Sequence, residues 1–530
     1  MSRVKTLSEA LIQAEAKGQD RPALYYFDTV MTYGELLDTV MRVAQGLKTL
    51  GVKPRDRVAV MLQNMPASVV VHFAVWALGA AVVPVNVMLT RGEIGAQLMD
   101  AGASVLVALT SLADRVEGLD QELSALDAIV LVDDRQDFSG MAPLWLPPHG
   151  AASPPMVSYQ NLLDQPPLNP EQWVPTNEGD MALLTYTSGT TGVPKGAVNT
   201  HGQMLHNVFI YESLALLSGD TVNVAFAPLF HITGSVAGLA AAVGLAAPLV
   251  LLYRFDPRVA AEAIQRRRAE FTVGAITTYL GMLALEDLDA YDLSSLTRAY
   301  SGGAPVAEAT LTAFHARTGI YIHNVYGLTE SNNGLIMVPW GERAPVDPES
   351  GALSIGRTGS GVEASIRDMD DPRQEVPAGS LGELALKGPS IIEAYWQRPD
   401  ANRASFIDGW FLTGDVARMS ADGWIYIVDR KKDVIISAGN KVWPRDVEDA
   451  LYQHPGVLEA VVVGLPDPYR GEAVTAFVVR SSAGANLEPK ELEAFLRERL
   501  AAYKIPRAIH WVDSIPKTAT GKFLRRAFRQ

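Results

Sequence analysis

From Arg57 onward, short apolar runs alternate with helical segments, and this alternation constrains the fold more than any other feature. Val58–Leu62 has the apolar, β-branched composition of a buried strand, Pro66–Leu78 is typical of a helix, and Ala80–Pro84 is typical of a second strand. Strands that are apolar throughout are characteristic of parallel sheets covered by helices. We therefore predict a large N-terminal region built from βαβ units.

The sequence pattern changes twice further along the chain, and each change indicates a separate subdomain or domain. After Gly341, short alternating runs such as Glu383–Lys387 are separated by Gly, Pro and Asp, which predicts a small antiparallel or barrel-like β subdomain. Near Asp429 a strand–helix–strand pattern begins, followed by another strand and helix, which predicts a small α+β domain. The expected fold class is α/β, with more than one domain because 530 residues exceed a single compact core.

The composition narrows the classes of function. A formal net charge of −14 argues against a nucleic-acid binder, which needs a basic surface to neutralise phosphates. The absence of cysteine excludes disulfides, thiolate metal sites and a cysteine nucleophile. The most membrane-like stretch, Val236–Leu252, is short for a bilayer span and contains Pro248, so we expect a buried helix followed by a buried strand. A cytoplasmic protein without stable membrane insertion is predicted.

The strongest local signal is the loop Thr187–Gly196, which follows the apolar run Met181–Tyr186. It contains four hydroxyl side chains, three glycines and Lys195. Glycines allow backbone N–H groups to converge on an anion, hydroxyls add donors and the lysine adds a positive charge. Its order differs from a Walker P-loop, because Lys195 is followed by Gly196. A Ser/Thr/Gly surface turn is the alternative, but so many donors after a buried strand favour a polyphosphate site.

Four other stretches carry side chains that suit the binding of a nucleotide. Ser301–Pro305 is a glycine turn suited to a flat ligand, and Tyr326–Glu330 combines an aromatic ring, a hydroxyl and a carboxylate. Gly409–Asp415 offers a carboxylate that can accept two ribose hydroxyls, and Pro516–Lys522 places a lysine on a glycine-bearing turn. Each is weak alone, because such residues usually belong to turns or solvated surfaces. Their joint presence in this order predicts a nucleotide–Mg²⁺ site.

In this order the motifs resemble those of the adenylate-forming superfamily, which includes acyl-CoA synthetases, adenylation domains of peptide synthetases and luciferases. The resemblance extends from Met31 to Lys522, and the stretch Asp429–Pro444 is particularly similar to bacterial fatty-acyl and aryl CoA ligases. It implies an N-terminal adenylation domain over residues 1–428, which binds the acid and ATP. It also implies a mobile C-terminal domain over residues 429–530, which carries the catalytic lysine.

The resemblance further implies which residues bind ATP and CoA. The loop Thr187–Lys195, called the phosphate loop below, would hold the β- and γ-phosphates. Asn324 would contact the exocyclic amine of adenine, and Asp415 would bind the ribose. Arg254 would contact a CoA phosphate, or equally would be a surface charge after a strand, and Gly439 would approach the thiol tunnel. The implied nucleotide and CoA residues are Thr187, Ser188, Gly189, Thr190, Thr191, Gly192, Lys195, Gly302, Gly303, Ala304, Asn324, Tyr326, Gly327, Asp415, Arg430, Arg254 and Gly439.

The catalytic residues implied by the resemblance are Lys522, His231, Thr329 and Glu330. Thr329 would contact the α-phosphate, Glu330 would ligate Mg²⁺, and His231 would lie beside the bound carboxylate. Chemistry independently supports Lys522, because attack of a carboxylate on phosphorus builds negative charge that a positioned ammonium stabilises. In the family the C-terminal domain then turns about a hinge that matches Asp429, which removes Lys522 from the site.

The predicted function is ATP-dependent activation of a carboxylic acid to an acyl-adenylate, followed by transfer of the acyl group to coenzyme A. A fatty, bulky cyclic or aryl acid is expected, although Ile276–Thr278 departs from the Val-Pro-Thr of many relatives. Transfer to an amine and loading of a carrier protein stay open. A non-catalytic nucleotide-binding regulator is disfavoured, since it would be expected to lose Lys522 or Glu330. The acid and the oligomeric state, a homodimer included, also stay open.

Overall fold

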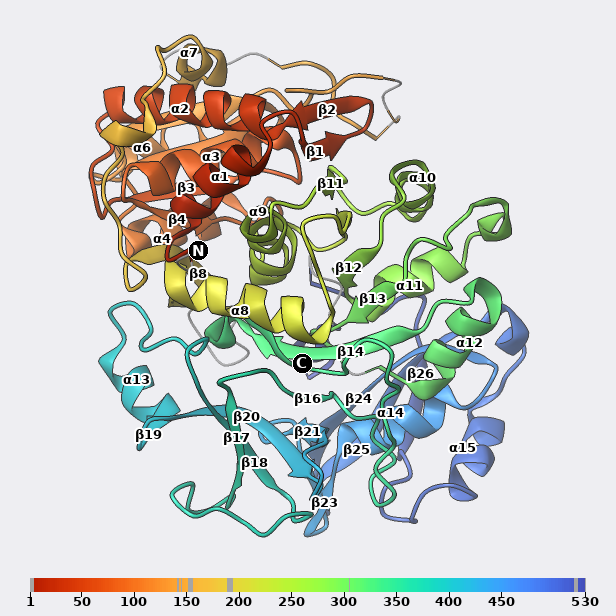
Figure 1. The fold of residues 1–530 in the computed structure, drawn as a ribbon. Coiled ribbons are helices and arrows are strands. Elements are labelled where there is room, and N and C mark those ends of the chain that lie inside the picture. The colour runs from red at the N-terminus through yellow and green to blue at the C-terminus, as the bar shows by residue number, and fades with distance from the viewer. Residues whose placement is uncertain are drawn as a thin grey trace.

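The computed structural model describes residues 4–140, 143, 145–150, 156–187, 194–304, 306–518 and 523–529. Within these ranges the chain forms two large sheets, a smaller antiparallel sheet and a C-terminal sheet, with helices packed over and between them (Figure 1). They are called sheets I to IV below. This architecture confirms the predicted α/β class, including the antiparallel part and the small C-terminal α+β part.

Sheet I has the strand order β16-β15-β14-β13-β12-β10-β11-β1-β2. The strands from β14 to β1 are parallel to their neighbours, and antiparallel strands follow at both edges. Their bounds are β1 (Pro22–Tyr26), β2 (Thr29–Thr32), β10 (Asn223–Ala225), β11 (Leu249–Leu251), β12 (Phe271–Gly274), β13 (Arg298–Ser301), β14 (Ile322–Leu328), β15 (Asn333–Met337) and β16 (Arg357–Thr358).

Sheet II has the order β7-β6-β5-β3-β4-β8-β9 and is parallel up to β8, which pairs antiparallel with β9. The apolar runs that predicted these strands are fully buried, as parallel sheets covered on both faces require. The bounds are β3 (Arg57–Met61), β4 (Ala81–Pro84), β5 (Val105–Leu109), β6 (Ala128–Val132), β7 (Val157–Ser158), β8 (Met181–Thr187) and β9 (Lys195–Thr200).

Helices cover both sheets, and α8 lies between them, where it contacts β9 and β15 (Figure 1). A reciprocal cap starts α8 directly after β9: Gln203 N–H donates to the Thr200 hydroxyl, and the Gln203 side chain accepts the Thr200 N–H. The helices of this part are α1 (Leu7–Lys17), α2 (Tyr33–Thr49), α3 (Pro66–Ala77), α4 (Arg91–Ala101), α5 (Ala113–Val116), α6 (Leu119–Glu122), α7 (Tyr159–Leu163), α8 (His201–Leu214), α9 (Ala241–Leu245), α10 (Pro257–Arg267), α11 (Ile276–Leu283) and α12 (Glu308–Thr318).

Sheet III is antiparallel and shares a hydrophobic core with α8 and sheet I, in which Leu384 and Phe411 pack with Tyr211 and Leu335. Its strands take the order β17-β18-β20-β19, with β21 beside β20. The bounds are β17 (Glu363–Arg367), β18 (Gly382–Lys387), β19 (Phe406–Ile407), β20 (Trp410–Met419), β21 (Ile425–Arg430) and helix α13 (Pro399–Ser405).

Sheet IV and its two helices have a hydrophobic core of their own, which includes Val447, Val462, Val478 and Leu492. The order is β23-β22-β25-β24, and β26 pairs parallel with β25. The bounds are β22 (Ile435–Ser437), β23 (Asn440–Val442), β24 (Val457–Asp467), β25 (Gly471–Arg480), β26 (Ala508–Trp511), α14 (Pro444–Tyr452) and α15 (Pro489–Arg497). The domain boundary at 428/429 stays a prediction, which this separate core supports.

The carboxyl ends of sheets I and II are tied together by buried hydrogen bonds. Asn64, after β3, accepts the Leu229 N–H at 2.7 Å, and Leu229 follows β10. Tyr253, after β11, donates its hydroxyl to Asp134, after β6, at 2.6 Å. The loops that leave the two parallel sheets therefore face one another, which is where α/β proteins bind ligands.

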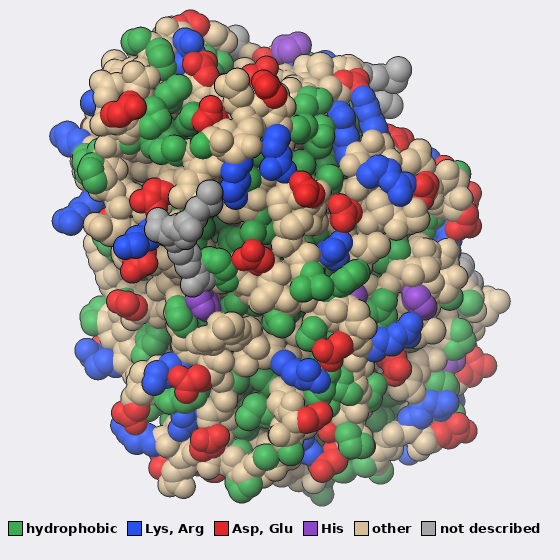
Figure 2. Space-filling view, in the orientation of Figure 1, with side chains coloured by type: hydrophobic (Ala, Val, Ile, Leu, Met, Phe, Trp, Pro, Cys, Tyr) green, Lys and Arg blue, Asp and Glu red, His purple; other side chains and the backbone are tan. Residues whose placement is uncertain are grey.

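Two further expectations concern the charge of the surface and the possibility of a membrane span. On the face shown in Figure 2, acidic and basic side chains are interspersed. Within the described residues, every helix is too short or too polar to cross a bilayer. Val236–Leu252 starts in a π-helix (Gly234–Ala240), continues into α9 and ends with β11, so the expected buried helix and strand are confirmed with a different helix type at the start.

The proline- and serine-rich composition and weak periodicity of residues 133–180 predict a surface connection, and the structure differs from this prediction. The segment contains β7, which pairs with β6, and the short helix α7. Tyr159 and Leu162 of α7 are buried, and Leu162 packs so closely on Gly46 that an added Cβ there would lie 2.6 Å from it. One helical turn with two buried residues is too short to produce a helical pattern in the sequence.

Three buried histidines predict acid sensitivity of the fold. Burial lowers the pKa of His72, His201 and His323 to about 4. Between their ordinary pKa near 6.5 and the lowered pKa of about 4, the unfolded chain binds protons that the folded chain does not. The stability of the fold therefore decreases as the pH falls through that window. When the pH is lowered from 7.5 to 5.0, the free energy of unfolding of His72→Leu should fall by about 2 kcal/mol less than that of the parent protein. Urea unfolding at the two pH values measures this difference. Equal losses would contradict the neutral, buried state of His72.

Candidate active site

The predicted site residues follow the carboxyl ends of neighbouring parallel strands in sheet I. His231 follows β10, Arg254 follows β11, Gly302 follows β13, and Thr329 and Glu330 follow β14. Since parallel strands point in one direction, their following loops gather at one edge of the sheet. The structure therefore brings together residues that lie up to about a hundred positions apart in the sequence.

The phosphate loop is the connection of the β8–β9 hairpin. Thr187, the last residue of β8, pairs with Lys195, the first residue of β9. The predicted phosphate-binding residues Ser188, Gly189, Thr190, Thr191 and Gly192 lie outside the described residues. Because Thr187 and Lys195 are held opposite each other by strand pairing, both ends of the loop are fixed.

Glu330 and Lys195 meet at the side chain of Tyr395. The Tyr395 hydroxyl donates to Glu330 Oε1 at 2.7 Å, and Lys195 Nζ lies 5.1 Å from the centre of the tyrosine ring. Among the described residues, Glu330 Oε2 accepts no hydrogen bond from a protein group. A cation, a carboxylate and the phosphate loop thus lie together, as binding of a polyphosphate with its metal ion requires.

Glu330 also suits Mg²⁺ as a carboxylate ligand. Within the described ranges no group of three or more His, Asp or Glu side chains is arranged to hold a metal ion. Mg²⁺ characteristically takes one or two protein carboxylates and completes its coordination with substrate phosphates and water. The residues present therefore fit a magnesium ion that enters with a nucleotide.

The adenine side of the predicted site is built on β13 and β14. Gly302 N–H donates to the Gly274 carbonyl, which fixes the turn of Gly302, Gly303 and Ala304 onto β12. Gly327 permits β14 to approach Asn333 closely, because a Cβ at Gly327 would lie 1.8 Å from the Asn333 carbonyl oxygen. Backbone atoms rather than side chains therefore form this wall, which suits a flat ring.

Asn324 has the polar atom that an adenine amine needs. Its Nδ2 donates to the Ser354 carbonyl at 2.8 Å, which orients the amide. Its Oδ1 is buried and has no hydrogen-bond partner among the described residues. A buried acceptor without a partner is costly, and an N–H donor from a ligand would satisfy it.

Tyr326, Arg430 and the buried Asp415 form a chain of polar contacts. The Tyr326 hydroxyl donates to Asp415 Oδ2 at 2.6 Å, and Arg430 Nε lies 3.0 Å from Asp415 Oδ1. Burial, and then Asp415, raise the pKa of Tyr326 well above its ordinary value, so its hydroxyl stays a donor. Asp415 is 2% exposed, and both carboxylate oxygens already have protein partners. Ribose hydroxyls would therefore share this carboxylate with Tyr326 and Arg430.

His231 lies on a tight turn that leads into the π-helix Gly234–Ala240. A Cβ at Gly234 would lie 2.1 Å from the Pro228 carbonyl oxygen, so only glycine fits there. His231 Nδ1 accepts the Thr233 N–H at 3.3 Å. Asn64 fixes the same turn, because it accepts the Leu229 N–H and donates to the Ala227 carbonyl. π-Helical turns are frequent at functional sites.

The sequence belongs to a known family. It matches the AMP-binding enzyme family over residues 12–396 and the AMP-binding enzyme C-terminal domain over residues 446–522. The chain is 34% identical to a long-chain-fatty-acid–CoA ligase of Bacillus subtilis, over 98% of this chain and 94% of the relative. It is 35% identical to a feruloyl-CoA synthase of an Amycolatopsis species, over 96% and 95%.

The chain is an AMP-binding enzyme. The structure agrees, because a solved structure of an anthranilate CoA ligase in complex with anthranoyl-AMP superposes with a TM-score of 0.87 at 27% identity, covering 100% of this chain and 97% of that chain. The predicted superfamily and the predicted class, an AMP-forming acid–thiol ligase, are thereby confirmed. The roles of individual residues stay predictions.

Lys522 of this AMP-binding enzyme lies outside the described residues, but its flanks are described. Lys517 and Phe523 pair as an isolated β-bridge, and Lys517 is paired with Glu459 on β24. On the other side, Arg525 contacts Glu448 of α14. The chain on both sides of Lys522 is therefore fastened to the C-terminal sheet and helix.

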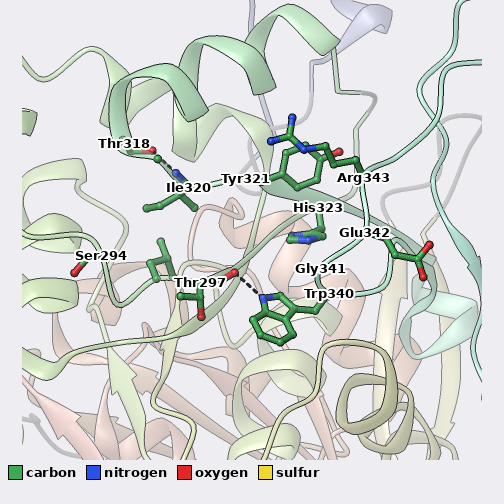
Figure 3. A pocket seen from close by; sticks show the side chains of 12 residues that line it. Ser294, Thr297, Thr318, Ile320, Tyr321, His323, Trp340, Gly341, Glu342 and Arg343 are labelled. Carbon is green, nitrogen blue, oxygen red and sulfur yellow. Dashed lines mark hydrogen bonds between the residues drawn. The ribbon is translucent and has the colours of Figure 1, made fainter.

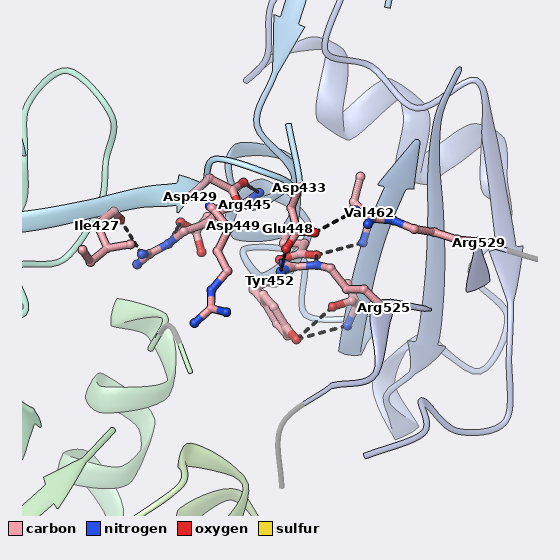
Figure 4. Close-up of polar contacts among 12 residues, drawn as sticks. Ile427, Asp429, Asp433, Arg445, Glu448, Asp449, Tyr452, Val462, Arg525 and Arg529 are labelled. Atoms are coloured by element: carbon pink, nitrogen blue, oxygen red, sulfur yellow. Dashed lines mark hydrogen bonds and ion pairs between the residues drawn. The ribbon is translucent and has the colours of Figure 1, made fainter. Parts of the chain in front are cut away.

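A buried polar network surrounds the predicted hinge at Asp429 (Figure 4). The Asp429 carboxylate accepts the N–H groups of Arg430 and Arg445, at 2.7 and 2.9 Å. Arg445 also donates to the Ile427 carbonyl of β21 at 2.6 Å, so it joins α14 to sheet III. Burial raises the pKa of Asp429 to about 7, against the opposing effect of Arg525.

The two predicted CoA contacts lie apart from this network. Arg254 is exposed and stacks over Trp145, 4.5 Å from the ring centre. This contact is compatible with both interpretations of Arg254, a surface charge and a phosphate contact. Gly439 is exposed in the β22–β23 turn with a φ of 81°, and an added Cβ would meet no atom within 4 Å. Its backbone conformation, not close packing, favours glycine.

A cavity of about 490 Å³ lies at the opposite edge of sheet I (Figure 3). Thr297 and Tyr321 precede β13 and β14, and the Trp340 indole donates to the Thr297 carbonyl at 3.0 Å. These residues lie at the amino ends of the strands, whereas the predicted site residues follow the carboxyl ends. The cavity therefore does not belong to the nucleotide site.

Sequence reasoning missed Tyr395 and Asn64. Tyr395 lies in the stretch Ile391–Pro399, which contains no local phosphate-binding pattern, and Asn64 stands alone after a buried strand. The available signal for Asn64 was its place at the carboxyl end of β3, where functional residues of parallel sheets gather. Tyr395 gave no local signal, because its partners are 65 and 200 residues away.

Asn64→Ala should impair adenylation through the turn that carries His231. Without the side-chain amide, the Leu229 N–H and the Ala227 carbonyl lose a buried partner, and His231 is no longer held in place. We expect kcat/KM for pyrophosphate release to fall about tenfold to a hundredfold. In a His231→Ala background the same change should cost little more, because the effects of residues coupled through one turn are not additive. Equal losses in both backgrounds would contradict this route.

Proposed function

We propose that this AMP-binding enzyme is an ATP-dependent acid–CoA ligase. In the first step a carboxylate oxygen attacks the α-phosphorus of ATP, the bond to the bridging oxygen breaks, and pyrophosphate leaves. In the second step the CoA thiol attacks the acyl carbon, loses its proton, and AMP leaves. The observation that carries this proposal is the meeting of Lys195, Glu330 and Tyr395 beside the phosphate loop, at the edge where Asn324 and Asp415 also lie.

The site residues take separate roles in this proposal. Thr187 and Lys195, with the loop between them, bind the pyrophosphate portion of ATP, and Glu330 holds the magnesium ion. Bound magnesium supplies positive charge to the phosphates. Thr329 contacts the α-phosphate; its carbonyl accepts the Asn199 side-chain N–H at 3.0 Å, which fixes the backbone of the turn. Pre-oriented groups of this kind stabilise developing charge without reorganisation.

The acid is proposed to be a fatty or aryl acid that reaches the α-phosphate beside His231. The relatives named for a long-chain fatty acid and for a feruloyl group support this class. Ile276–Thr278 begins α11 at the end of β12, next to this region. Gly274 is packed there against Thr278 and Phe226, since a Cβ would lie 2.6 Å from the Thr278 hydroxyl. Small and aromatic side chains therefore line this end of β12.

The C-terminal part, residues 429–530, is proposed to alternate between two orientations about Asp429. Its separate hydrophobic core supports movement as a unit. Arg430 and Arg445 would change partners in such a movement, because both contact groups on sheet III. Lys522 would serve adenylation in one orientation, and Gly439 would approach the thiol in the other.

Coenzyme A is the proposed acceptor, with an amine or a carrier protein as the alternatives. ATP and CoA as co-substrates are consistent with a cytoplasmic location, which stays a prediction, as does a homodimer. The two half-reactions, measured separately, identify the acid and the acceptor.

The first test is pyrophosphate release with ATP, Mg²⁺ and a panel of fatty, aryl and cyclic acids. At least one acid should stimulate release, and addition of CoA should give a thioester that mass spectrometry identifies. No stimulation by any acid would contradict the adenylation proposal. Adenylate that forms but reacts with an amine rather than CoA would show the amide-forming alternative.

A second test separates the two half-reactions through Lys522. Lys522→Ala should slow adenylate formation by a factor of about 100 or more, because the charge that stabilises the transition state is lost. Thioester formation from synthetic acyl-AMP and CoA should be largely spared, since Lys522 is absent from the site at that stage. Lys517→Ala, on the same turn but paired with Glu459, is the control and should affect both steps little. Equal losses in both steps of Lys522→Ala would contradict two catalytic orientations.

A further inference from the structure

Tyr395 joins the two charged groups of the phosphate site through one side chain. Its hydroxyl donates to Glu330 Oε1 at 2.7 Å, while Lys195 Nζ lies 5.1 Å from its ring centre. The side chain is 6% exposed. Tyr395 therefore contacts a carboxylate with its polar end and an ammonium with its ring face.

The backbone around Tyr395 is attached to the same two groups. Trp396 N–H donates to the Gly196 carbonyl at 2.7 Å, next to Lys195, and Ala197 and Tyr395 form an antiparallel bridge. Ile392 N–H donates to the Glu330 carbonyl at 2.8 Å. The segment 392–396 thus extends the β9 edge of sheet II and reaches the turn after β14 of sheet I.

The segment is also held from its outer side. Asn402 of α13 contacts both backbone polar groups of Tyr395: its Oδ1 accepts the N–H at 2.7 Å, and its Nδ2 donates to the carbonyl at 3.3 Å. The Trp396 indole donates to the Asp100 carbonyl at 3.1 Å, and Arg398 pairs with the Asp100 carboxylate. Tyr395 is therefore held rigidly before any ligand binds.

We propose that Tyr395 is a positioning residue that fixes Glu330 for magnesium and Lys195 for pyrophosphate, so that the metal and the leaving group are bound as one unit. This inference rests on the proposed adenylation function. The hydroxyl occupies Oε1 and leaves Oε2 of Glu330 for the metal ion. Hydrogen bonds to a ligating carboxylate orient it, and their loss typically lowers metal affinity 10- to 100-fold. The ring holds the Lys195 ammonium over one face by cation–π attraction.

Tyr395→Phe tests the hydroxyl and keeps the ring. The dissociation constant of Mn²⁺ is measured by electron paramagnetic resonance in the presence of α,β-methylene-ATP, which cannot release pyrophosphate. Removal of the hydroxyl should raise this constant about tenfold or more, because Glu330 loses its orienting donor. Thioester formation from synthetic acyl-AMP and CoA, which uses neither magnesium nor pyrophosphate, should stay within about twofold of the parent enzyme.

Tyr33→Phe is the matched control. It removes a buried tyrosine hydroxyl that donates to the Ala247 carbonyl at 2.9 Å, before the amino end of β11 and so at the opposite end of that strand from the predicted site. Its Mn²⁺ dissociation constant should equal that of the parent enzyme. A similar rise in Tyr33→Phe and Tyr395→Phe would overturn the positioning role, because any lost buried hydrogen bond would then have the same effect.

Tyr395→Leu tests the ring through Lys195, with inorganic pyrophosphate as the probe. Lys195→Ala should weaken pyrophosphate binding as strongly in the Tyr395→Phe background as in the parent enzyme, since both keep the ring. In the Tyr395→Leu background the further loss should be at least about threefold smaller, because Lys195 is already displaced. Equal losses in all three backgrounds would overturn the coupling between Lys195 and Tyr395.

The outcomes separate this inference from the proposed function. If the parent enzyme binds Mn²⁺ with α,β-methylene-ATP and releases pyrophosphate with an acid, but Tyr395→Phe binds Mn²⁺ equally well, only the role of Tyr395 fails. If the parent enzyme releases no pyrophosphate with any acid, the adenylation function fails instead. Thermal unfolding of each variant, unchanged within about 2 °C, would exclude a general loss of the fold.

Discussion

Hydrogen bonds between the two large sheets hold the candidate active site of this enzyme together. Asn64 binds the turn after β10, Asp134 binds Tyr253 after β11, and Asn199 of β9 binds the turn after β14. Each bond joins sheet II to sheet I. Because parallel strands all point the same way, the first two bonds bring the loops that follow the parallel strands of both sheets toward one space. The predicted phosphate loop, the glycine turn after β13 and the His231 turn lie at that end of the sheets.

A second layer of contacts comes from the chain that follows the large sheets. The segment 392–396 adds to the edge of β9 and places Tyr395 between Lys195 and Glu330. On sheet III, Asp415 is held by Tyr326 of sheet I and by Arg430 at the start of the C-terminal part. The site is therefore assembled across three sheets, and its charged groups are oriented before a nucleotide binds. Such pre-orientation is a main source of electrostatic stabilisation in enzymes.

The predicted elements that the structure confirms are those with long, periodic or fully apolar patterns. The parallel strands of both large sheets and the helix α14 are examples, because burial on both faces or on one helical stripe leaves a pattern in the sequence. The segment 133–180 was predicted less well, since α7 has one turn with two buried residues. Motifs also predicted candidate ligand-binding residues, such as Glu330 and Asp415. Supporting residues such as Asn64 and Tyr395 carry no motif, because their partners lie far away in the chain.

The sequence by itself determined the family, the parallel α/β architecture and the chemistry of the loop ends, because these depend on local composition and on motifs within about ten residues. Only the tertiary structure decided which of those groups touch. Lys195 and Glu330 are 135 positions apart in the chain, and Tyr395, which contacts both, is 65 positions beyond Glu330. Contacts at such separations arise from strand order and sheet packing, which one sequence encodes only through the whole fold. The local pattern therefore predicted the phosphate loop, and the packing of the sheets placed Tyr395 in contact with both Lys195 and Glu330.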